Sequence, residues 1–264
     1  LMFSFKEPQT IRSISLGRMG ADRYRRSRIL EASDDGVNWT LLSDILPDAI
    51  TKQFSFNVRP TTARHFRYSS TDGTCLECAE IRINASSRVE IDTEKAGFYI
   101  SGSVRDNYPT PPVDDAVPED GIIDISRHCR DGKLNWNAPE GRWKILRFGW
   151  SLTGKVNAPA SPEATGLEVD KFDRAAVLDY YDNYLSMYQE ASDNALGKVI
   201  SHIMIDSYEA GCQNWTRNME REFESRRGYA LRPWMPALAG IVIGSADRTE
   251  RFLSDWRKTL GELM

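Results

Sequence analysis

The chain has 264 residues, of which 41% are hydrophobic and 27% charged, and 34 basic against 38 acidic residues give a formal net charge of −4. This composition is close to the globular average, so it excludes a disordered, collagen-like or coiled-coil chain. No apolar run approaches the roughly 20 residues that span a bilayer. The slight negative charge gives no reason to expect nucleic acid as a partner. We therefore expect a globular chain of one large or two ordinary domains, with no membrane insertion.

The first third of the chain has the pattern of an antiparallel β-sandwich. Short alternating or β-branched runs are separated by turn residues, as in Ser33-Asp34-Asp35-Gly36, and no helical period interrupts them. The predicted strands cover residues 11–16, 28–32, 37–42, 53–58, 64–69 and 80–84. We expect this domain to span residues 1–88.

A β-rich connecting segment is expected over residues 89–150. Four prolines between Pro109 and Pro118, interspersed with acidic residues, exclude the interior of a sheet and favour a surface wrap. The aromatic and apolar run from Trp143 to Trp150 then predicts a buried strand.

The pattern changes to α/β over residues 151–264. After a long loop over 153–170, four-residue aromatic spacing from Phe172 predicts an amphipathic helix with Asp173 as N-cap. The apolar run 199–205 predicts a strand buried on both faces, and residues 219–227 predict a helix ended by Gly228. Asp247 and Glu250 form a capping-box pattern before a last helix. We expect part of a parallel barrel or sheet.

Two carboxylates follow the predicted strand 199–205. Asp206 and Glu209, with Tyr208 between them, would lie at the carboxyl edge of that strand, where parallel α/β folds carry their catalytic groups. Partial burial there suits general acid–base work. The alternative is structural, because Asp206 could cap the next segment and Glu209 could pair with a nearby arginine.

Two further groups of polar residues are candidates for ligand contact. Asn214 and Trp215 combine an amide with an aromatic face, which is what a sugar-binding site needs. Glu168 and Asp170, at the end of the long loop, could face a site or bind a hard cation such as calcium through oxygen ligands. Two acids do not define a metal site, and the charge preference of a helix N-terminus explains them equally well.

Cysteines give no metal site. Cys75 and Cys78 form a lone C-x-x-C, and none of the three histidines supplies the spacing that a structural zinc ion requires. A local disulfide or two reduced thiols remain as alternatives.

Several runs in order resemble glycoside hydrolase family 106, the bacterial α-L-rhamnosidases. They are 164–171 (ATGLEVDK), 206–209 (DSYE), 213–216 (QNWT) and 226–229 (RRGY), with support from 143–149 and 244–253. The resemblance covers roughly residues 88–264. Residues 31–39 and 63–68 are similar, more weakly, to a galactose-binding-like sandwich of the discoidin type.

This resemblance implies a (β/α)₈ TIM-barrel catalytic domain that acts on terminal α-L-rhamnose in plant pectic glycans. It implies an inverting mechanism with two glutamates and a calcium ion near the site, in a periplasmic or extracellular enzyme. By position, Glu209 would be the general acid, and the second glutamate would lie beyond Met264. Family members commonly carry Trp where this chain has Tyr208, which puts subsite preference in question.

The candidate site residues are therefore Glu209 for catalysis and Asp206, Tyr208, Asn214, Trp215, Glu168 and Asp170 for substrate contact. Both ends of the chain fall within strand or helix patterns, so we expect an internal fragment of a longer enzyme, inactive by itself. The alternative is a non-catalytic carbohydrate-binding fragment or a degenerate homologue. A second carboxylate facing Glu209 in the complete protein would discriminate between them.

Overall fold

The computed structural model describes residues 1–17, 28–45, 53–71, 73, 78–99, 109–204, 208 and 210–264. By their contacts, the residues divide into two compact units. The first joins Leu1–Leu146 to Ala230–Arg257, and the second joins Arg147–Tyr229 to Lys258–Met264. The predicted boundaries at residues 88 and 150 stay a prediction.

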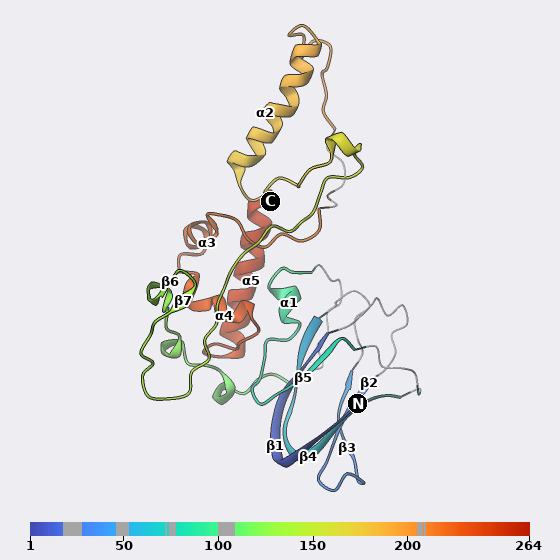
Figure 1. The fold of residues 1–264 in the computed structure, drawn as a ribbon, viewed down its shortest axis with the longest axis vertical. Helices are drawn as coiled ribbons and strands as arrows, with labels where there is room; N and C mark the ends of the chain where they lie inside the picture. The colour runs from blue at the N-terminus through green and yellow to red at the C-terminus, as the bar shows by residue number, and fades with distance from the viewer. Residues whose placement is uncertain are drawn as a thin grey trace. The chain divides into compact units, whose positions relative to one another are not determined.

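The first unit is built on a five-stranded antiparallel sheet with strand order β3-β2-β4-β1-β5 (Figure 1). Its strands are β1 (Met2–Gly17), β2 (Arg28–Ser33), β3 (Thr40–Ile45), β4 (Gln53–Ser70) and β5 (Glu80–Asn84). The antiparallel sheet is confirmed, and the two runs predicted at 53–58 and 64–69 form one long strand. The sandwich stays a prediction.

One face of the sheet carries its apolar core. Alternate residues such as Ile14, Leu30, Phe56 and Phe66 are fully buried there, as expected for the period of two along a strand. The turn at Ser33–Gly36 is also as predicted, with Gly36 at φ +75°. Asp35 accepts bonds from the Val37 and Asn38 amides, which hold the pKa of its carboxyl below the usual range.

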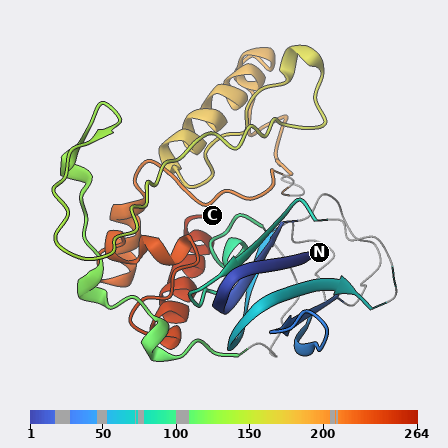
Figure 2. The same cartoon turned by 60° about the horizontal axis from the view of Figure 1, so that its bottom comes forward.

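The first unit also contains α1 (Asp92–Lys95), α4 (Met235–Leu238), α5 (Ala246–Leu263) up to residue 257, and a small hairpin of β6 (Cys129–Arg130) and β7 (Lys133–Leu134). Figure 2 shows the short α1 beside α5, where the Trp256 indole donates to the Ala96 carbonyl at 3.0 Å. The predicted capping box is wrong. Ser245 Oγ accepts from the Arg248 amide at 3.2 Å, while Asp247 pairs with Arg251.

The second unit contains α2 (Arg174–Ala191) and α3 (Met219–Arg227). Both predicted helix signals are confirmed. Asp173 caps α2 by accepting from the amides of Ala175 and Ala176, and Gly228, at φ +78°, ends α3 with its amide on the Glu224 carbonyl.

Two predicted buried strands, 143–150 of the connecting segment and 199–205 of the α/β part, are not found among the described residues. Residues 143–150 and 199–204 form no strand in this structure. Their apolar side chains are open to solvent, with Trp150 71%, Val199 73% and Met204 89% exposed. A strand needs a hydrogen-bonding neighbour, and in the described part of the chain these two runs have only the isolated bridge between Ile200 and Leu196.

Cys78 lies at the edge of the sheet core, with its thiol 2.9 Å from the Glu80 carbonyl oxygen. Burial raises the pKa of this thiol. Cys75 lies outside the described residues, so the prediction about this pair is not resolved.

Candidate active site

The long loop before α2 is closed upon itself rather than structureless. Val156 and Leu167 form an isolated antiparallel bridge, and the Glu168 amide donates to the Lys155 carbonyl at 3.0 Å. Asn157 fastens the interior, because its Oδ1 accepts from the Gly166 amide at 2.7 Å and its Nδ2 donates to the Ala164 carbonyl at 3.0 Å. The closed loop fixes the backbone from which Glu168 projects.

Glu168 is paired within the chain. Its Oε2 lies 2.5 Å from Lys171 Nζ, and both side chains are about a quarter exposed, at 24% and 25%. A half-buried pair of this kind is less screened than one on the open surface. The pair presents a carboxylate, which accepts hydrogen bonds, next to an ammonium, which donates them. Together they can bond the hydroxyl groups of a sugar.

Asp170 joins the start of α2 to residues 213–216. Its Oδ1 accepts from the Phe172 amide at 2.9 Å and from the side-chain amide of Gln213, and its Oδ2 accepts from Thr216 Oγ1 at 2.7 Å. Gln213 Oε1 in turn accepts from the Lys171 amide at 3.2 Å. Because both oxygens of Asp170 already bond protein donors, the residue is an anchor of the site.

Tyr208 is 45% exposed. Burial raises the pKa of its phenol, while the positive charge of Lys171 opposes that rise and Cys212 and Glu168 add to it. Tyr208 therefore shares its surroundings with the Glu168–Lys171 pair, although 37 or more residues separate them along the chain.

Gly211 belongs to the same part of the unit. It has φ +76°, and a Cβ there would lie 3.0 Å from Lys155 Cε. The glycine thus permits both a left-handed backbone and the close passage of a lysine side chain.

Two of the predicted site residues, Asp206 and Glu209, lie outside the described residues, so their roles remain predictions. Asn214 and Trp215 are half-buried, and the Trp215 carbonyl accepts from Gln213 Nε2 at 3.2 Å. The structure thus brings Glu168 and Asp170 together with Tyr208 and residues 210–216. Sequence reasoning missed Gln213 as the residue that joins them. Its only signal was its place in the polar run with Asn214 and Trp215.

The two candidate calcium ligands are bonded within the chain. Glu168 pairs with Lys171, and each oxygen of Asp170 accepts a hydrogen bond from a protein donor. Among the residues that the structure describes, no three His, Cys, Asp or Glu side chains form a group that could hold a metal. The same residues include no helix long and apolar enough to cross a membrane.

Comparison with known proteins identifies the family. The model of glycoside hydrolase family 106, described as alpha-L-rhamnosidase, matches residues 14–264. This chain belongs to that family. The structure of a rhamnosidase from Novosphingobium sp. PP1Y is similar to it, with a TM-score of 0.78 and 32% identity over 99% of this chain and 25% of that one.

A curated relative from Formosa agariphila carries a different name. It is 40% identical over 171 residues, which are 62% of this chain and 15% of the relative, and is called "Putative beta-glucuronidase". A pectin-binding carbohydrate-binding module matches 31% of this chain and 63% of its own at 19% identity, with a TM-score of 0.28. The family 106 chain thus spans a quarter or less of the length of its relatives in sequence and structure.

Proposed function

We propose that the full-length protein hydrolyses terminal α-L-rhamnosides of plant pectic glycans with inversion of configuration. The observation that carries this proposal is the family match over residues 14–264. The site supports it with a half-buried carboxylate–ammonium pair beside an aromatic hydroxyl, at Glu168, Lys171 and Tyr208. Such groups bond sugar hydroxyls, while Trp215 offers a ring for the apolar face of the sugar.

In this mechanism Glu209 is the general acid. It protonates the departing glycosidic oxygen as the C–O bond breaks, while a second carboxylate takes a proton from the attacking water. Inversion requires the two carboxyl groups to be about 6.5–9.5 Å apart, so that water fits between base and sugar. We assign the second carboxylate to a part of the longer protein outside this chain.

The barrel belongs to the same proposal. The apolar runs 143–150 and 199–204 have strand-like sequences but are exposed here, and the matched rhamnosidase is about four times longer than the aligned segment. We assign the run 199–204 to a strand of a (β/α)₈ barrel whose neighbouring strands come from the rest of the longer protein, and the run 143–150 to the connecting segment before it. Location in the periplasm or outside the cell follows from the substrate, and fractionation of cells tests it.

The test uses the full-length protein with aryl α-L-rhamnosides and Glu209→Gln. A missing general acid costs about 10²–10⁴-fold in rate, and the loss should be largest for poor leaving groups that need protonation. Glu224→Gln, at an exposed glutamate of α3, is the matched control and should leave the rate unchanged. An unchanged rate in Glu209→Gln removes Glu209 from this role. NMR of the first product anomer tests inversion.

Calcium is tested in the same assay. We propose that the complete enzyme binds the ion through residues beyond those described, so chelation should lower rhamnose release and added calcium should restore it. Full activity after chelation, in protein shown by metal analysis to lack calcium, would contradict this.

A second candidate is a β-glucuronidase, favoured by the name of the relative that is 40% identical. An aryl β-glucuronide in the same assay separates the two activities. Release of neither sugar by a folded full-length protein would favour the remaining alternative, a carbohydrate-binding protein without turnover. The 264-residue chain alone is expected to be inactive in all assays, because half of a catalytic pair gives little rate.

A further inference from the structure

The sheet of the first unit has a buried polar face. Ile14 and Leu16 of β1 point to the apolar core, whereas Ser13 and Ser15 alternate to the other face and are also buried. On β4, Ser55 and Asn57 pair with these serines and are likewise buried. Buried polar groups are retained where partners satisfy them, so this face is built to meet another polar surface.

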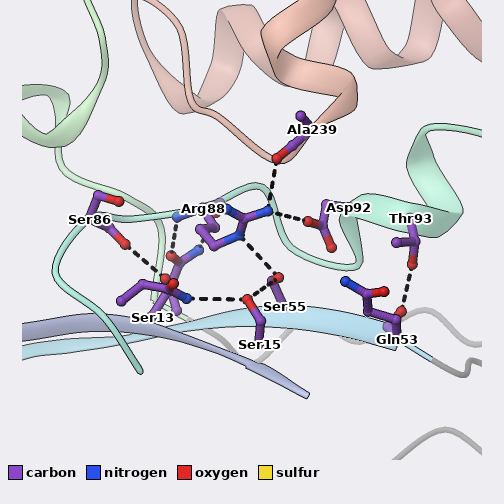
Figure 3. Close-up of polar contacts among 11 residues, drawn as sticks. Ser13, Ser15, Gln53, Ser55, Ser86, Arg88, Asp92, Thr93 and Ala239 are labelled. Carbon is purple, nitrogen blue, oxygen red and sulfur yellow. Dashed lines mark hydrogen bonds and ion pairs between the residues drawn. The ribbon is translucent and has the colours of Figure 1, made fainter. Parts of the chain in front are cut away.

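The serines of this face are joined to one another and to the next segment. Ser15 Oγ lies 2.8 Å from Ser55 Oγ, and Asn84 Nδ2 donates to Ser15 Oγ at 3.2 Å. Ser13 Oγ donates to the Ser86 carbonyl at 2.8 Å (Figure 3). Residues 86–92 therefore lie against the polar face.

Arg88 links this face to a distant part of the chain. Its Nε donates to Ser55 Oγ at 3.2 Å, and its Nη2 donates to Asp92 Oδ2 at 2.7 Å and to the Ala239 carbonyl at 2.8 Å (Figure 3). Its backbone is held as well, because the Asn57 side chain accepts from the Arg88 amide and donates to its carbonyl, both at 2.9 Å. One side chain thus ties β4 to the end of α4.

Further bonds join residues 89–96 to residues 240–256. The Val89 amide donates to the Gly240 carbonyl at 2.9 Å, and Lys95 Nζ lies 2.6 Å from a carboxylate oxygen of Glu250. The buried Trp256 indole bonds Ala96. These contacts reach from the loop after α4 into the third turn of α5.

Gly240 gives the junction a strict shape requirement. It has φ +81°, and a Cβ at this position would collide with the Arg88 guanidinium and the Asp92 carboxylate. The absence of a side chain at residue 240 is therefore a condition for the Arg88–Asp92 pair.

We propose that the sheet and residues 236–257 form one cooperative folding unit, locked across the polar face by Arg88, so that the sheet is a fixed scaffold of the enzyme. An autonomous glycan-binding module would instead unfold independently of α5. This proposal does not depend on the substrate or on Glu209.

Native-state hydrogen exchange of the full-length protein in increasing urea tests the proposal without any substitution. The most protected amides of β1 and β4 and those of α5 up to residue 257 should converge on one unfolding isotherm. Two separate isotherms, with α5 opening while the sheet stays closed or the reverse, would contradict the proposal that the sheet and residues 236–257 unfold as one unit.

Arg88→Met tests the lock itself, with Arg59→Met on the exposed surface of β4 as control. Loss of bonds to a charged group should speed exchange about tenfold or more in the sheet and α5 together, and the control should change both less than about twofold. Equal effects of the two variants would contradict the role of Arg88.

Gly240→Ala probes the same lock while keeping every polar partner. Gly132→Ala is the matched control, because Gly132 also has a positive φ, +74°, but a Cβ there meets nothing within 4 Å. Both variants carry the same backbone strain, so only Gly240→Ala should lower the protection of sheet and α5 together. Similar losses of protection in both variants would show that the Arg88–Asp92 pair does not require glycine at residue 240.

Discussion

Glu90 is a half-buried carboxylate in the segment that follows β5. Its Oε1 has no hydrogen-bond partner within the described chain, and burial raises the pKa of its carboxyl above the usual value of 4.5 although Lys95 and Asn57 oppose the rise. The native state therefore holds this proton more tightly than the unfolded state does. The free energy of unfolding therefore falls as the pH rises from 4.5 through the native pKa of Glu90, because the folded state must then give up this proton.

We expect Glu90→Gln to unfold at a higher temperature than the parent at pH 7 and to lose that advantage at pH 4. Thermal unfolding across this range is the measurement. Glu7→Gln, at an exposed position of β1, should show no such crossover. A Glu90→Gln advantage that is independent of pH would show that shape, not charge, is responsible.

Asp170 is expected to be a structural anchor of the candidate site. Asp170→Asn keeps the shape of the side chain but replaces an acceptor oxygen by a donor, which faces donors from Gln213, Thr216 or the Phe172 amide. We expect a loss of about 1–3 kcal/mol in stability, measured by denaturant unfolding. Asp182→Asn, at an exposed position of α2, should cost far less; an equal cost would contradict the anchor.

Sequence reasoning places Asp170 in the site but does not reveal this anchor. The partner Gln213 lies 43 residues further along, and nothing in local periodicity links the two. The Asp173 cap, by contrast, bonds amides two and three residues away, so residue type and position alone predict it.

Substitution by alanine should change stability in opposite directions at two helix glycines. Gly228 ends α3 at φ +78°, where alanine is strained, and Gly261 lies inside α5, where a Cβ would meet nothing within 4 Å. Gly228→Ala should destabilise by about 1 kcal/mol, and Gly261→Ala should stabilise by up to about 1 kcal/mol. Unfolding midpoints of both variants check this, and shifts of the same sign would be inconsistent with it.

Helices and antiparallel strands were predicted where local signals suffice. The runs 143–150 and 199–204 show the limit, because they carry strand residues but form no strand here. Strand formation depends on a neighbour, which no local pattern supplies. The capping box failed for a related reason: Glu250 is held by Lys95, 155 residues away.

Helix α2 carries a row of exposed aromatic rings. None of its 18 residues is buried, yet Tyr180, Tyr184 and Tyr188 form a row of ring contacts along it. An exposed aromatic row of this length is unusual for a surface helix. We expect the rest of the longer protein to cover it.

In the full-length protein, Tyr184→Ser should then cost about 3 kcal/mol, as expected for removing a large buried aromatic side chain. The measurement is denaturant unfolding of the full-length protein, with Asp182→Ser of the same helix as control. A near-neutral Tyr184→Ser would mean that the tyrosine row remains open to solvent.

The polar sheet face also bears on how the protein is made. The serines and Asn57 find their partners in residues 84–92, directly after the last strand, whereas Ala239, the second partner of Arg88, lies 151 residues further along. At about 5–20 residues per second, the ribosome needs roughly 8–30 s to deliver those residues. During this wait water can hydrate the Arg88 guanidinium and the Asp92 carboxylate, whereas an apolar surface in their place would invite aggregation. The charged pair that later meets residues 236–257 thus protects the nascent chain.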